Sequence, residues 1–182
     1  SYKQIKPFEP IVVDFAGAFD GYLVDQTRIF CIGGLPEQLL KAYDDMVRIQ
    51  NRLLEIARPG VTWGAVYDNC YRLACELGYA DCFMGNQGAQ VSFIGHGIGV
   101  EIDEYPFIAR GFNDYELKEN MTFAFEPKAV FAGLGAVGGG HGGKGHPLAS
   151  ARAGRRMPHA SRPSKTARNR SRPFDRGRKS KA

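Results

Sequence analysis

The sequence is poor in the features that mark secreted, membrane-bound and disulfide-stabilised proteins. Its 182 residues include four cysteines, none of which forms a CxxC pair: Cys31, Cys70, Cys75 and Cys82. No apolar run approaches the roughly 20 residues that a membrane-spanning helix needs. The first residues, SYKQIKPFEP, lack the basic and then apolar layout of a signal peptide. We therefore expect reduced cysteines, no membrane segment and a cytoplasmic location.

Acidic residues are almost missing from the last quarter of the chain. Residues 139–182 contain 13 of the 24 Lys and Arg residues but only one of the 19 acids, so they carry a net charge of +12 and leave −7 for residues 1–138. This segment is rich in Gly, Ser and Pro and has almost nothing to bury, so we expect a disordered, low-complexity basic tail. Residues 1–138 are long enough for one domain with a core.

The basic tail allows two interpretations. Thirteen cations would bind phosphate with strong salt dependence, so nucleic-acid association is one of them. However, the tail holds a single aromatic residue, Phe174, and no platform for base stacking. The abrupt change of composition after Gly138 is also what a reading-frame shift in a GC-rich gene would produce, and we favour this second interpretation.

Two acids lie within a predicted β-hairpin near the start of the chain. Residues 11–16 and 22–30 are rich in β-branched and aromatic residues and flank Asp20-Gly21, a strong hairpin signal. With an even number of loop residues, Asp14 and Asp25 share one face of the hairpin and lie opposite or diagonal to each other. Taken alone, the pair is better explained without a ligand, by solubility of an edge strand or capping of a turn.

Helical periodicity follows the hairpin. Apolar spacing predicts helices over 36–57 and 62–78, with Pro36 in a first turn and Thr62 as an N-cap. We expect strands over 121–127 and 129–133 that pair with each other, and a mostly irregular segment over 101–120. The fold class is therefore α+β, with a curved antiparallel sheet covered by helices.

Two further residues complete a candidate metal-ligand set. His96 stands between glycines in GHGIG, where bare backbone allows close approach to a ligand, and Glu126 ends a strand before Pro127. Converged carboxylates need a neutralising partner, and carboxylate oxygen with imidazole nitrogen suits Mn, Co, Zn or Fe. For His96 alone, a satisfied core histidine is the default alternative.

Taken together, Asp14 and Asp25 with DQTR, then GHGIG, then FEP at 125–127, resemble the metallopeptidases of the pita-bread fold. That family includes methionine aminopeptidases, Xaa-Pro aminopeptidases and Xaa-Pro dipeptidases, and DQTRIF resembles the Xaa-Pro branch. The resemblance covers about residues 7–138 and implies two divalent metal ions, Mn or Co foremost. Asp14 would bind one ion, Asp25 would bridge both and His96 would bind the other. Glu126 would be a ligand and the general base.

Departures from the family pattern predict impaired activity. A bridging Glu is expected near position 140, where this chain has glycine, with His141 as a poor substitute. A substrate-facing His is expected at the position of Asp103, and we place Asp103 and Tyr105 in the substrate pocket, although Tyr105 equally suits packing. The leading function is a metal-dependent exopeptidase of the Xaa-Pro type that acts on peptides. The alternatives are a non-catalytic pita-bread binding module and the nucleic-acid role of the tail, and a homodimer stays open.

Overall fold

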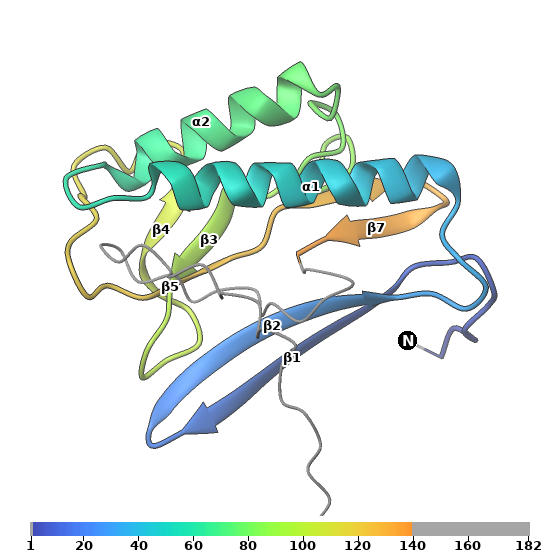
Figure 1. Cartoon of the computed structure of the whole chain (residues 1–182), viewed down its shortest axis with the longest axis horizontal. Helices are drawn as coiled ribbons and strands as arrows, with labels where there is room; N and C mark the ends of the chain where they lie inside the picture. Colours follow the sequence, from blue (N-terminus) through green and yellow to red (C-terminus); the bar gives the residue numbers. More distant parts are fainter. Residues whose placement is uncertain (1, 140–182) are drawn as a thin grey trace, which may run out of the picture.

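The computed structural model of the chain describes residues 2–139, so the tail predicted over 139–182, His141 included, lies outside the described residues except for Gly139. In Figure 1 the two helices lie together over the short strands β3 to β7, and a long hairpin lies on the other side of those strands. The elements in chain order are β1 (Ile11–Phe19), β2 (Tyr22–Phe30), α1 (Glu37–Ile56), α2 (Trp63–Glu76), β3 (Phe93–Gly97), β4 (Glu104–Ala109), β5 (Phe123–Phe125), β6 (Lys128–Phe131) and β7 (Gly135–Gly138). In this part of the chain, neither helix is long and apolar enough to cross a membrane.

The strands are all antiparallel and form three small ladders, in the orders β1-β2, β4-β3-β5 and β6-β7. The prediction that 129–133 pairs with 121–127 is wrong. The three residues of β5 are buried and pair with β3, while β6 pairs with β7. Gly133, with φ of +76°, lies in the turn that brings β7 back onto β6 instead.

The segment 101–120 is more regular than its sequence indicates, because β4 lies within it. Pro106 is part of β4, and proline usually argues against a strand because it cannot donate to a ladder. β4 is an edge of its ladder, which is where proline is tolerated. The segment is otherwise mostly irregular, as predicted, and β4 at residues 104–109 is the part that the prediction missed.

The hairpin of β1 and β2 forms as predicted. Asp20 and Gly21 make a two-residue turn with φ of 51° and 81°, the positive values that a tight hairpin turn requires. Asp14 pairs with Thr27 and Ala16 pairs with Asp25, so the two aspartates are diagonal neighbours on one face. The opposite face exposes apolar side chains, including Phe15 at 48%, Phe19 at 82% and Tyr22 at 64%.

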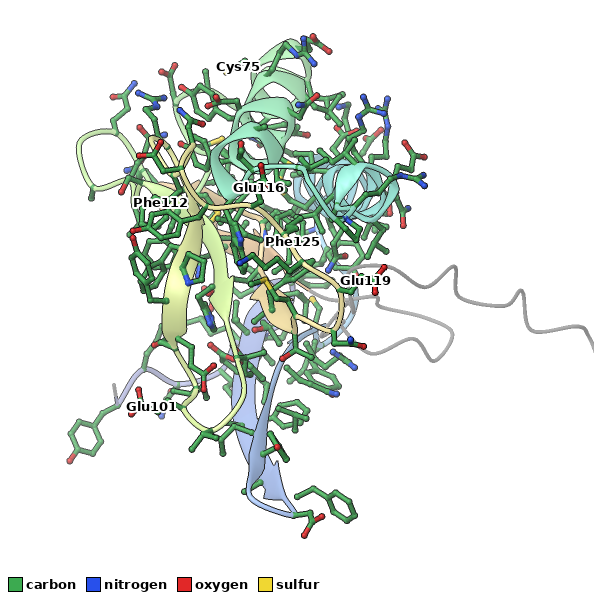
Figure 2. All side chains as sticks on the ribbon, turned by 90° about the vertical axis from the view of Figure 1, so that its left-hand side faces the viewer. Cys75, Glu101, Phe112, Glu116, Glu119 and Phe125 are labelled. Atoms are coloured by element: carbon green, nitrogen blue, oxygen red, sulfur yellow. The ribbon has the colours of Figure 1, made fainter. Side chains whose placement is uncertain are left out.

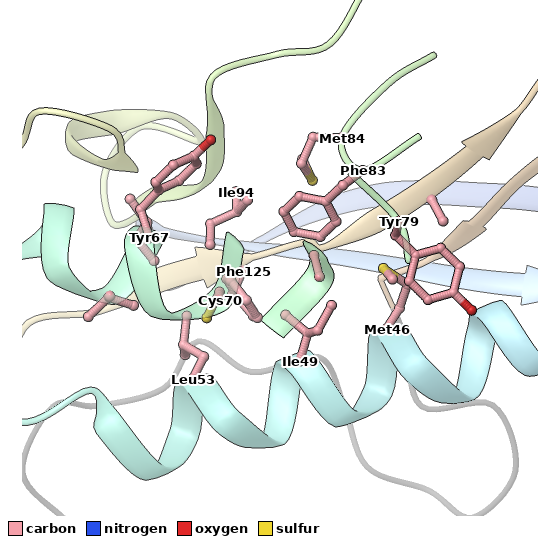
Figure 3. Packing of buried hydrophobic residues seen from close by; sticks show 14 of the residues in the cluster. Met46, Ile49, Leu53, Tyr67, Cys70, Tyr79, Phe83, Met84, Ile94 and Phe125 are labelled. Carbon is pink, nitrogen blue, oxygen red and sulfur yellow. The ribbon is translucent and has the colours of Figure 1, made fainter. Parts of the chain in front are cut away.

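Both helices match the sequence prediction within two residues at each end. The hydroxyl of Thr62 accepts a hydrogen bond from Ala65 N at 3.2 Å and caps α2. The apolar faces of both helices bury a cluster with β3 and β5, which Figure 3 shows from nearby; its labelled members include Met46, Ile49, Leu53, Cys70, Phe83, Ile94 and Phe125. This core holds β3 and β5 in place, and these strands position His96 and Glu126.

One buried acid belongs to the scaffold and not to the site. Asp45 on α1 is 5% exposed and accepts hydrogen bonds from Lys41 Nζ (2.6 Å), Tyr79 Oη (2.8 Å) and Arg48 Nη1 (3.0 Å). Burial alone would raise the pKa of Asp45, but these hydrogen bonds outweigh it and hold the pKa below its usual value. Asp45 therefore ties α1 to the segment after α2.

Candidate metal centre

His96 lies at the centre of the candidate site, on the middle strand β3. Its side chain is 2% exposed, and Nδ1 lies 3.0 Å from the carbonyl oxygen of Gly97. Because a carbonyl oxygen only accepts, Nδ1 is the donor in this contact, which leaves Nε2 to face the site. The imidazole orientation is thus fixed by the backbone of its own strand.

Three carboxylates converge on His96 Nε2 from separate parts of the chain. Asp103 Oδ1 lies 3.0 Å away, Asp25 Oδ2 3.6 Å and Glu126 Oε1 3.7 Å. Asp25 comes from β2, Asp103 from the loop between β3 and β4, and Glu126 directly follows β5. The structure therefore brings together residues that are up to about one hundred positions apart in sequence.

Asp14 joins this group through the hairpin. Its Oδ1 accepts a hydrogen bond from the hydroxyl of Thr27 at 3.0 Å, and it is near enough to Asp25 to act on its pKa. The pKa of Asp25 is raised above its usual value, first by burial and then by the negative charges of Asp14 and Glu126, while His96 opposes the shift. The site is thus an excess of negative charge gathered around one imidazole.

Backbone contacts fix the hairpin and Glu126 against β3. Leu23 N donates to Gly99 O at 2.7 Å and so attaches β2 to the loop that follows β3, while Glu126 N donates to Ile94 O at 3.0 Å. The glycines beside His96 serve this packing. A Cβ on Gly95 would collide with the carbonyl oxygen of Ala124, and one on Gly97 would lie 2.9 Å from that of Glu104. The close approach they permit is that of neighbouring strands, not that of a ligand as the sequence suggested.

The two predicted substrate residues occupy different surroundings. Asp103 contacts His96 directly, although 63% of its side chain is exposed. Tyr105 is 58% exposed and packs edge-on against Tyr115, with ring centroids 4.9 Å apart. The pKa of Tyr105 is raised to about 12, mainly by a hydrogen bond with Tyr115 and to a smaller extent by burial. The rings of Phe107 and Phe112 extend the same aromatic cluster.

Sequence reasoning missed two supporting residues, Thr27 and Lys128. Lys128 Nζ binds Glu126 Oε2 at 2.9 Å, which leaves Oε1 of that carboxylate toward His96. The position of each residue in the sequence could have indicated its role. Thr27 is opposite Asp14 in the hairpin, and Lys128 follows Glu126 by two positions along an extended chain.

The side chains around His96 are of the kinds that bind a divalent cation, although they do not surround a common point. Among residues 2–139, no group of three or more His, Cys, Asp and Glu side chains surrounds a point in the way that holds a metal ion. The fit rests on chemistry. A nitrogen donor and several carboxylate oxygens match the ligands that Mn, Co, Zn or Fe takes, and Lys128 is the cationic side chain that contacts one of these carboxylates.

A buried imidazole faced by carboxylates from several β-segments is an arrangement typical of metal-dependent hydrolases. The chain belongs to metallopeptidase family M24, whose sequence model matches residues 1–145. Its relatives and structural neighbours place it in the Xaa-Pro branch of the pita-bread fold, as the sequence predicted.

The Xaa-Pro dipeptidase of Pyrococcus furiosus is 31% identical over 137 residues, which are 75% of this chain and 37% of that protein. The probable dipeptidase PepE of Mycobacterium bovis is 34% identical over 134 residues, 73% of this chain and 34% of that protein. The crystal structure of X-Pro aminopeptidase from Thermotoga maritima has a TM-score of 0.69 at 30% identity and covers 76% of this chain and 37% of that one. This chain thus spans little more than a third of the length of these relatives.

Proposed function

We propose that the chain carries the metal-binding part of an exopeptidase of the Xaa-Pro type, which removes the N-terminal residue from a peptide. The observation that supports this most directly is the convergence of Asp25, Asp103 and Glu126 on the buried His96. Asp14, Asp25, His96 and Glu126 would hold two divalent ions, with Mn or Co preferred. The four cysteines are free, which agrees with a reducing compartment such as the cytoplasm.

Each residue has a role that its contacts support. The two ions, when bound, would polarise the scissile carbonyl and lower the pKa of water. Glu126 would accept the proton of the attacking water through Oε1, because Lys128 holds Oε2. The free amino end of the substrate would lie at the metal centre that Asp14 and Asp25 help to hold, which would limit cleavage to the N-terminal residue.

Slow turnover is part of the proposal. Asp103 is an acid at the position where the family resemblance calls for a His that could donate a proton to the developing oxyanion, and position 140 carries glycine where it calls for a bridging Glu. A non-catalytic binding module is the second candidate. The observation in its favour is that Asp103 already contacts Nε2 of His96.

The test uses the full chain loaded with Mn²⁺ or Co²⁺. Metal content after dialysis and hydrolysis of an Xaa-Pro dipeptide and a longer Xaa-Pro peptide would be measured for the wild type, for Asp25→Asn and for Asp20→Asn. Asp20→Asn removes the same charge from the same hairpin but at its turn. We expect metal binding and slow hydrolysis that only Asp25→Asn abolishes. Binding without hydrolysis supports the binding module, and binding that survives Asp25→Asn contradicts the assigned site.

A further inference from the structure

Asp103 is the acid nearest to His96, although the family resemblance assigns it no metal. Its Oδ1 lies 3.0 Å from Nε2, against 3.6 Å for Asp25 and 3.7 Å for Glu126, two of the expected ligands. The side chain is 63% exposed, so burial does not force it into this position. An exposed carboxylate that nevertheless lies beside a buried imidazole needs a specific explanation.

The distance itself fits ligands that share an ion. Donors held at about 2.0–2.2 Å from one metal, at angles between octahedral and tetrahedral, lie about 2.8–3.6 Å from each other. The separation of Asp103 Oδ1 from His96 Nε2 lies near the short end of that range, and that of Asp25 Oδ2 at the long end. Asp103 therefore needs no larger movement than Asp25 to become a ligand of the same ion as His96.

The loop that carries Asp103 is well defined. Glu104 Oε1 accepts hydrogen bonds from Val100 N at 2.7 Å and Glu101 N at 3.0 Å, which closes the turn. The pairing of β3 with β4 also shifts here, because His96 is opposite Phe107 while Gly97 is opposite Glu104. Such irregularities commonly re-aim a side chain near a functional site. In Figure 2, Glu101 marks this loop, on the side of the molecule where the hairpin lies.

We infer that Asp103 is itself a metal ligand, which supplies an additional carboxylate oxygen to the ion held by His96. This inference rests on the proposed function and replaces the substrate-binding role that the sequence suggested for Asp103. A further oxygen donor makes the site harder, so the advantage of Zn²⁺ over Mn²⁺ at His96 is expected to be smaller than it would be without Asp103.

Metal binding by the full chain tests the inference without relying on activity. Titration calorimetry with Mn²⁺ would compare the wild type, Asp103→Asn and Glu101→Gln, which removes an equal charge from an exposed position in the same loop. We expect Asp103→Asn to weaken Mn²⁺ binding by about 10- to 100-fold. Loss of a residue that only hydrogen-bonds to a metal ligand already has an effect of this size, so loss of a ligand should have at least as large an effect. Glu101→Gln should change it by less than about fivefold, as expected for a surface charge.

Two further readouts separate ligation from a structural role. The visible absorption of bound Co²⁺ should change in Asp103→Asn but not in Glu101→Gln, because it reports the donor atoms. Asp103→His, which offers nitrogen in place of oxygen, should keep binding and shift preference toward Zn²⁺. If Asp25→Asn loses the metal while Asp103→Asn keeps the wild-type affinity and spectrum, this inference is wrong and the proposed function stands. If the wild type binds none of these ions, both fail.

Discussion

Replacing Asp25 by Asn should stabilise the metal-free protein even though it destroys the metal site. The raised pKa of Asp25 means that its ionised form is less favourable in the folded state than in the unfolded chain, first because of burial and then because of Asp14 and Glu126. Asn is similar in shape and uncharged, so it removes the repulsion that the ionised carboxylate suffers. The Asp25→Asn variant is therefore expected to be more stable than the wild type in the absence of metal, and to have lost metal binding.

The size of the effect follows from the distances. Asp25 Oδ2 and Glu126 Oε1 lie 3.6 and 3.7 Å from the same nitrogen, so they are at most about 7 Å apart. Two unit charges at about 7 Å repel by about 0.6 kcal/mol in water and about 2.4 kcal/mol at an effective permittivity of about 20. Attraction to His96 offsets part of this. We therefore expect Asp25→Asn to raise the free energy of unfolding by about 1 kcal/mol at neutral pH.

The pH dependence gives the sharper test. Below the pKa of an unfolded Asp, about 3.9, the carboxyl is protonated in both states and the variant gains nothing. As the pH rises through the raised folded pKa, the wild type loses stability relative to Asp25→Asn, and the gap then stays constant. Urea unfolding with EDTA between about pH 4 and pH 8 would measure it, with Asp20→Asn as the control. A gap that does not grow with pH, or an unstable Asp25→Asn, would refute the reasoning.

Three further predictions concern the scaffold. Gly95→Ala should lower the free energy of unfolding by about 1–3 kcal/mol, because the added Cβ meets the carbonyl of Ala124. Thermal melting would measure this loss. As the control, Gly17→Ala should leave the stability nearly unchanged, because its Cβ meets only a side-chain methyl at 3.7 Å. Asp45→Asn should cost about 1–3 kcal/mol at pH 7, and this deficit should shrink as the pH falls through the lowered pKa of Asp45. Phe15→Thr, on the exposed face of the hairpin, should reduce self-association in size-exclusion chromatography.

Each of these has a clear contrary result. Equal effects of the two glycine substitutions would mean that the close approach of β5 to β3 does not require Gly95. A deficit of Asp45→Asn that persists in acid would show that the charge of this residue is not what stabilises α1. A wild-type chain that elutes as a sharp monomer, unchanged by Phe15→Thr, would show that the exposed apolar face of the hairpin causes no association.

Local signals in the sequence predicted those parts of the fold that local chemistry decides. The hairpin follows from a turn that only residues tolerant of positive φ can make, and α2 follows from the cap at Thr62. Strand pairing was harder, because the sequence of a short strand such as β6 does not say which neighbour it pairs with, and it pairs with β7. β4 was missed because Pro106 is acceptable only on an edge, and the sequence does not say which strand is the edge.

The candidate site, like the fold, was predictable only where local sequence decides the geometry. The diagonal placement of Asp14 and Asp25 follows from the hairpin register alone and could be predicted, while the gathering of Asp25 and Glu126 at His96 was reached through family resemblance. The contact of Asp103 with His96 was not predicted. It depends on the register shift between β3 and β4, which no local pattern of the sequence specifies.

The acids in the hairpin can now be given a physical reason. A strand that is mostly exposed can carry Asp14 at little cost, and Asp25 becomes costly only where the hairpin contacts the loop after β3 and places it near His96. The backbone bond from Leu23 N to Gly99 O makes that contact beside the carboxylates themselves. A cation bound there would neutralise the repulsion between carboxylates on the two parts, so metal binding should strengthen the contact of the hairpin with the loop after β3.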